Sequence, residues 1–114
     1  MSREEDLVRR LAAAADKAIG GVSARLMCLG LADGSEGYVA SVTVSRGRAA
    51  FAVSTGSGSD PDSAFGACLS DYLSSSLPYA LGTVWPERLA ASSAEELELR
   101  LASLGEEARP CTRG

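Results

Sequence analysis

Residues 22–53 contain three segments in which apolar and polar side chains alternate, and only short turns separate them. The segments cover residues 22–32, 38–44 and 49–53. Alternation with a period of two is typical of strands that bury one face. The turns at residues 33–37 and 45–48 are too short for the crossover that parallel neighbours need. The sequence therefore predicts a three-stranded antiparallel meander.

Helical patterns flank this meander on both sides. Residues 3–19 place apolar side chains at helical spacing, after a capping box at Ser2 and before the stop signal of Gly20. Residues 61–76 carry a second helical stripe. The predicted fold class is α+β, in the order α-β-β-β-α-α. It is a two-layer sandwich with the helices packed on one face of the meander.

The C-terminal part should add a connection and a third helix. Residues 77–92 form the connection, because Pro78 bars simple continuation of the second helix. A capping box at Ser93 begins the third helix, and we expect Gly105 to stop it. Residues 1–105 are then one α+β domain, and residues 106–114 are a flexible C-terminal tail.

The segment at residues 54–63, STGSGSDPDS, lies between a predicted strand and a predicted helix, where many proteins bind phosphate. Asp60 suits the N-cap of that helix and Pro61 its first position. Asp60 and Asp62 bring negative charge to the helix start, and no GKS or GKT sequence is present. We therefore expect a turn with a helix cap and not a phosphate site.

This junction resembles that of the double-stranded-RNA-binding-domain-like fold, of which HicB-type antitoxins use a partial version. Gly56, Gly58 and Ala64 match its G-x-G and helix alanine, within the same αβββα order over residues 2–76. The resemblance implies that fold. Pro61, Asp62 and Phe65 replace the lysines that contact phosphates in the family, which argues against its RNA-binding role.

Several kinds of chemistry are excluded by what the chain lacks. Without histidine there is no Ser-His-Asp or Cys-His catalysis and no histidine-bound metal. Cys28, Cys68 and Cys111 show no metal-ligand spacing, and we interpret the first two as buried free thiols in a reducing compartment. We expect a cytoplasmic protein that is not an enzyme, with no cofactor, no metal and no membrane span.

Charge favours binding to another protein. Residues 60–114 carry nine acidic and four basic residues, which suits a partner with a basic surface. One concrete form is a phage or mobile-element inhibitor of a basic nucleic-acid-binding protein. The candidate contacts are Asp60, Asp62, Asp71, Trp85, Glu95, Glu96 and Glu98. Trp85 has two interpretations, a lid over the core or an interface anchor.

Two alternatives remain open. Arg25, Arg46 and Arg48 could form a basic hairpin tip that contacts nucleic acid, although so few arginines make nucleic acid an unfavoured partner. The chain could instead be a structural or assembly subunit that forms a homodimer through an exposed strand edge.

Overall fold

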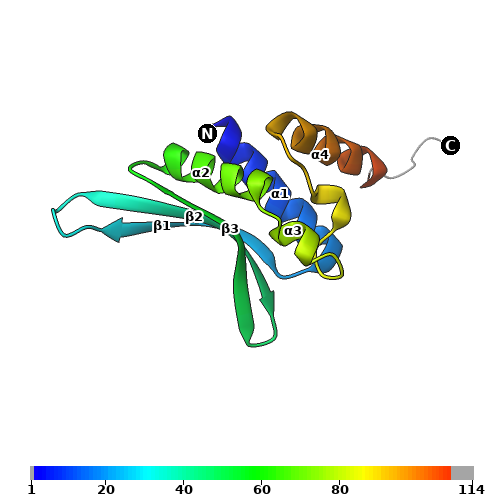
Figure 1. The fold of residues 1–114 in the computed structure, drawn as a ribbon, viewed down its shortest axis with the longest axis horizontal. Coiled ribbons are helices and arrows are strands. Elements are labelled where there is room, and N and C mark those ends of the chain that lie inside the picture. Colours follow the sequence, from blue (N-terminus) through cyan, green and yellow to red (C-terminus); the bar gives the residue numbers. More distant parts are fainter. Residues whose placement is uncertain (1, 109–114) are drawn as a thin grey trace.

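The computed structural model describes residues 2–108 of the chain, with side chains as far as Leu104. A sheet of three antiparallel strands lies in the order β1-β2-β3, and the helices cover one of its faces (Figure 1). This confirms the predicted α+β class and the meander. The elements are α1 (Arg3–Ile19), β1 (Val22–Gly30), β2 (Glu36–Arg46), β3 (Ala49–Gly58), α2 (Pro61–Ser74), α3 (Leu77–Ala80), η1 (Glu87–Leu89) and α4 (Ala94–Ala108).

One hydrophobic core joins the helices to the sheet. Leu7 and Leu11 of α1 pack with Val42 of β2 and Phe65 of α2, all fully buried. Burial of such side chains stabilises the fold by about 1.5–3 kcal/mol each. The single Trp85 closes this core from the segment between α3 and η1. None of the helices in residues 2–108 combines the length and the apolar character that crossing a membrane would require.

The two hairpins of the sheet extend past the helical layer (Figure 1). Val22 is the one buried residue of β1, and every residue from Arg25 to Gly30 is exposed. The β2–β3 hairpin bends away from the helices, beyond a register shift between Val42 and Thr43. The β1–β2 hairpin is therefore an arm with little cover of its own.

The structure corrects the boundaries predicted around residues 54–63. The glycine-rich residues as far as Gly58 belong to β3 and not to a turn. A Cβ atom on Gly56 would lie 2.0 Å from the backbone nitrogen of Cys68, so α2 rests directly on the strand. These glycines serve close helix–strand packing. Asp60 caps α2 as predicted, because its carboxylate accepts from the Ser63 N–H at 2.8 Å.

Three further predictions need correction. Helix α4 runs through Gly105 to Ala108, since a glycine inside a helix costs only about 1 kcal/mol. Pro78 lies in the first turn of α3, a position that tolerates proline, so the connection contains a short helix. Cys28 is exposed, because it lies on the uncovered half of β1, whereas Cys68 is buried. Cys111 and residues 109–114 of the predicted tail lie outside the described residues.

Candidate functional site

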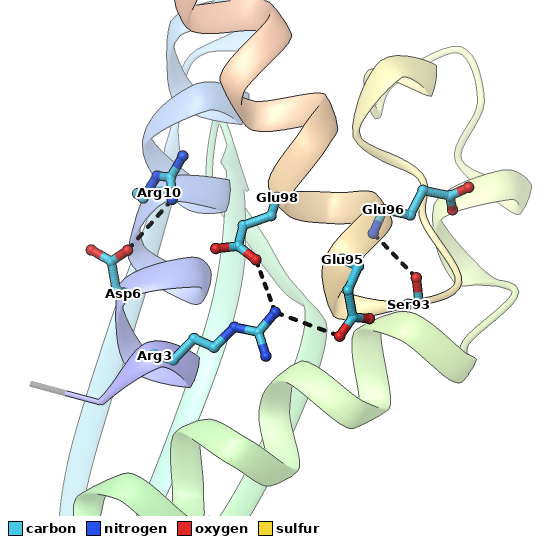
Figure 2. Close-up of polar contacts among 7 residues, drawn as sticks. All are labelled: Arg3, Asp6, Arg10, Ser93, Glu95, Glu96 and Glu98. Carbon is cyan, nitrogen blue, oxygen red and sulfur yellow. Dashed lines mark hydrogen bonds and ion pairs between the residues drawn. The ribbon is translucent and has the colours of Figure 1, made fainter.

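Most of the carboxylates predicted as partner contacts already bind within the chain. Arg3 of α1 pairs with Glu98 at 2.8 Å and with Glu95 at 3.6 Å, which ties α1 to α4 (Figure 2). The hydrogen bond to Glu98 raises the pKa of the Arg3 guanidinium. Glu96 receives the Ser92 N–H at 2.8 Å and pairs with Arg100 at 3.9 Å. Arg100 and Arg3 therefore already neutralise much of the charge at this end of α4.

The other two acidic positions differ from each other. The Ser63 backbone N–H and hydroxyl hold the pKa of Asp60 below its usual value, as expected for an ionised helix cap. Asp62 is exposed in the first turn of α2, and its side chain makes no hydrogen bond or ion pair with the described residues. Asp62 is thus the one predicted acidic contact that the described part of the fold leaves unused.

Trp85 occupies the core and not the surface. Its side chain is 1% exposed, and its Nε1–H donates to the Tyr72 hydroxyl at 3.0 Å. The Tyr72 hydroxyl donates in turn to the Leu89 carbonyl oxygen. Burial raises the pKa of Tyr72 to about 12. Of the two interpretations of Trp85, the structure therefore has the lid over the core, with no ring surface left for a partner.

The three arginines of the predicted basic tip do not act together. Arg46 binds the last carbonyl oxygens of α1, with Nη1 at 2.7 Å from Gly20 and Nη2 at 3.3 Å from Ile19. Arg48 is exposed beside it in the turn. Arg25 pairs in register with Ser41, five residues along β2 from Arg46. At about 3.3 Å per residue, that places Arg25 roughly 17 Å from the tip.

A groove of about 830 Å³ lies between α1, η1 and α4. Its walls are mostly alanines of α1 with Leu89, Leu101 and Leu104, and Arg10 and Lys17 stand at its edge. Arg10 also pairs with Asp6 at 3.5 Å. No side-chain nitrogen or oxygen that is buried within the described part of the chain lacks a hydrogen bond, so this groove contains no unpaired buried polar atom among the described residues.

The free edge of β1 is the feature that the fold leaves unsatisfied. Gly21 accepts from the Ser45 N–H at 2.8 Å, and the Leu31 N–H donates to Ser35 at 2.9 Å. Because an antiparallel ladder alternates, the odd-numbered residues of β1 bond to β2 and the even-numbered ones point outward. The outward N–H of Val22 donates a hydrogen bond to the Asp16 carboxylate at 3.0 Å. No hydrogen bond within residues 2–108 was found for the outward groups of residues 24, 26, 28 and 30.

Apolar side chains surround this free edge on both faces of the sheet. Leu26 and Cys28 lie on the helix side and Met27 and Leu29 on the open side, by the strand's alternation. All four are exposed, and Leu31 follows them in the turn. Arg25 is the one charged residue of the strand. We define residues 24–31 as the β1 edge.

The opposite edge of the sheet is protected in the C-terminal half of β3. The Thr55 N–H of β3 points outward and donates to the Asp71 carboxylate of α2 at 3.1 Å. The side chains around Thr55, at residues 54–58, are otherwise serines and glycines, which offer little apolar surface. Residues 49–52 are apolar, but they lie beyond the register shift, in the part of the hairpin that bends away from the helices (Figure 1). Asp71 therefore has a structural use that the sequence did not reveal, and β1 is the more open edge for another strand.

No family model, curated protein or solved structure was found to match this chain. The resemblance to the double-stranded-RNA-binding-domain-like fold stays a prediction. Residues 2–108 hold no cluster of three or more cysteine, aspartate, glutamate or histidine side chains that could bind a metal ion. The unpaired β1 edge is therefore the candidate functional site.

Proposed function

We propose that this protein is a protein-binding module without enzymatic activity, and that it binds by adding an extended polypeptide segment to the β1 edge. The observation that carries the proposal is the unprotected edge itself. Outward backbone groups at residues 24, 26, 28 and 30 have no partner in the described chain, and exposed apolar side chains flank them. Pairing by strand addition uses both features at once.

The chemistry of the edge defines the segment that fits it. The backbone groups require an extended strand, and the side chains require apolar residues on both faces of that strand. Soluble proteins usually protect such edges with charges, proline or a covering element. Of these devices the β1 edge has only the charge of Arg25, because the Asp16 carboxylate binds Val22, which lies before residues 24–31. A nucleic acid could not replace the strand, because its phosphates need clustered cations that Arg25 alone does not supply.

The acidic surface supports this function less well than the edge does. Asp60, Asp71 and Glu96 accept backbone hydrogen bonds inside the chain, and Glu95 and Glu98 pair with Arg3. A basic partner would have to compete with those contacts. The inhibitor hypothesis therefore rests on Asp62, which has no such contact among the described residues.

An affinity capture from the source cells with four variants separates these surfaces. Leu26→Pro removes an outward N–H, and Met27→Lys adds a charge to the edge; neither change touches the β1–β2 hydrogen bonds. Leu99→Lys makes the same kind of change on α4, where Leu99 is 73% exposed. Asp62→Lys tests the acidic surface. Circular dichroism checks that each variant folds.

We expect a stoichiometric protein partner that Leu99→Lys and Asp62→Lys retain and that both edge variants lose. Binding that survives both edge variants would refute the strand-addition proposal. Loss of binding in Asp62→Lys alone would transfer the function to the acidic surface.

A further inference from the structure

We propose that the segment bound at the β1 edge is β1 of a second copy of this chain, so that two three-stranded sheets join into one continuous sheet. The inference rests on the proposed function, since it names the partner of the same edge. The two β1 strands pair in antiparallel directions. They are related by a two-fold axis, the symmetry of most homodimers.

The chain itself contains a strand with the required chemistry. The partner strand must be extended, apolar on both faces and unpaired along one side. Within residues 2–108, β1 meets all three conditions, because Leu26, Met27 and Leu29 are exposed on alternating faces beside free backbone groups. A second copy therefore satisfies the edge, and by symmetry its own edge is satisfied by the same contacts.

The protected edge explains why the assembly should stop at two. If β1 of one copy could pair with β3 of the next, the sheet would grow without closing. Asp71 holds the outward N–H of Thr55 in the C-terminal half of β3, where serines and glycines replace apolar side chains. The apolar residues 49–52 of β3 lie beyond the register shift, in the bent part of the hairpin, and do not continue that edge in line (Figure 1). Pairing of β1 with β1 consumes both open edges and closes the dimer.

The free backbone groups also fix the register. Residues 24, 26, 28 and 30 point outward, and their centre of symmetry is residue 27. If Met27 lies on the two-fold axis, residue 24 pairs with residue 30 of the second copy, and residue 26 with residue 28. Every outward group then finds a partner. No other antiparallel self-pairing uses all four residues.

This register also separates the like charges. Arg25 lies opposite Leu29 of the second copy, so the two Arg25 residues are four positions apart along the paired strands. At about 3.3 Å per residue, that separation is roughly 13 Å, beyond the screening length of about 8 Å at physiological salt. The arginine stems can cover the neighbouring leucines while their charges reach water.

Sedimentation equilibrium of the purified chain tests the association. We expect the mass to rise with concentration from one chain to two and no further. Leu99→Lys should behave like the wild type. Met27→Lys, which places two ammonium groups at the axis, should stay monomeric. Met27 is 52% exposed in one chain, so this substitution need not disturb the monomer.

Disulfide formation tests the register. The background carries Cys28→Ser and Cys111→Ser. The native cysteine that remains, Cys68, is buried in the core. Residues on the axis form a non-hydrogen-bonded pair, with Cα atoms about 4.5 Å apart, which suits a disulfide. Mild oxidation should therefore cross-link Met27→Cys quickly. Leu29→Cys would have its Cα atoms roughly 13 Å apart and should not cross-link, and neither should Leu99→Cys.

Each outcome decides the proposal. A doubled mass that Met27→Lys abolishes, with selective cross-linking at residue 27, supports it. A chain that stays monomeric up to its solubility limit overturns it, as does a dimer that survives Met27→Lys. Faster cross-linking at residue 29 overturns the register. If the chain is monomeric but the cell capture still depends on the edge variants, the proposed function stands with a different strand as partner.

Discussion

At the scale of single residues, Gly56 of β3 lies where no side chain fits. Its Cβ atom would lie 2.0 Å from the Cys68 nitrogen and 2.4 Å from the Ala67 carbonyl carbon, both in the backbone of α2. Gly56→Ala must therefore push the helix off the strand. We expect it to lower the free energy of unfolding by about 3 kcal/mol, near the upper end for overpacking. Urea unfolding followed by circular dichroism measures the change.

Gly66 supplies the matched control, since it lies inside α2 with only the Glu4 Cγ near its added Cβ, at 3.9 Å. Gly66→Ala should raise the free energy of unfolding by about 0.5–1 kcal/mol, because alanine is the better helix former. Equal stabilities for the Gly56 and Gly66 variants would contradict the close packing of α2 on β3.

At the scale of elements, Arg46 joins the β2–β3 turn to the end of α1. Its guanidinium donates to the carbonyl oxygens of Gly20 and Ile19, which have no acceptor role within the helix. Arg46→Ala should destabilise the protein by about 1 kcal/mol. Arg48→Ala, two residues away and exposed, is the control and should have little effect. Thermal unfolding compares the two, and similar losses would mean that the arginine cap is unimportant.

The elements themselves were largely predictable, because they depend on local signals. Helix α1 begins at the Ser2 cap and ends before Gly20, as the sequence indicates, and three alternating segments became three strands. The extent of β3 was not predictable, because Gly56 and Gly58 normally weaken a strand. Their value appears only when α2 is placed on them, which is a contact between distant residues.

At the scale of the whole molecule, the candidate site was only partly predictable. An exposed strand edge was among the alternatives, but the sequence could not say which edge stays open. That depends on carboxylates from the helices: Asp71 of α2 reaches the β3 edge at Thr55, whereas Asp16 of α1 reaches β1 only at Val22. The acidic residues were chosen by charge alone. Charge does not show that Glu95 and Glu98 face Arg3, a pairing across almost the whole sequence.

Tyr72 of α2 accepts a hydrogen bond from Trp85, in the segment between α3 and η1. This contact should make the stability of the whole fold sensitive to alkali. Tyrosine ionises near pH 10.0 when unfolded, whereas burial raises the pKa of Tyr72 to about 12. The folded protein therefore holds this proton more tightly. The resulting stabilisation is complete below pH 10 and is lost as the pH rises towards 12. Two pKa units correspond to about 2–3 kcal/mol.

Tyr72→Phe isolates this effect. At pH 8 it should lower the free energy of unfolding by about 1–3 kcal/mol, because the Trp85 Nε1–H and the Leu89 carbonyl lose their partner. The gap to the wild type should narrow between pH 10 and 12, where the wild type loses the advantage of its buried phenol. Tyr79→Phe, at a ring 64% exposed, is the control. Urea titrations followed by Trp85 fluorescence measure the gap, and a constant value from pH 8 to 12 would show that Tyr72 does not couple ionisation to folding.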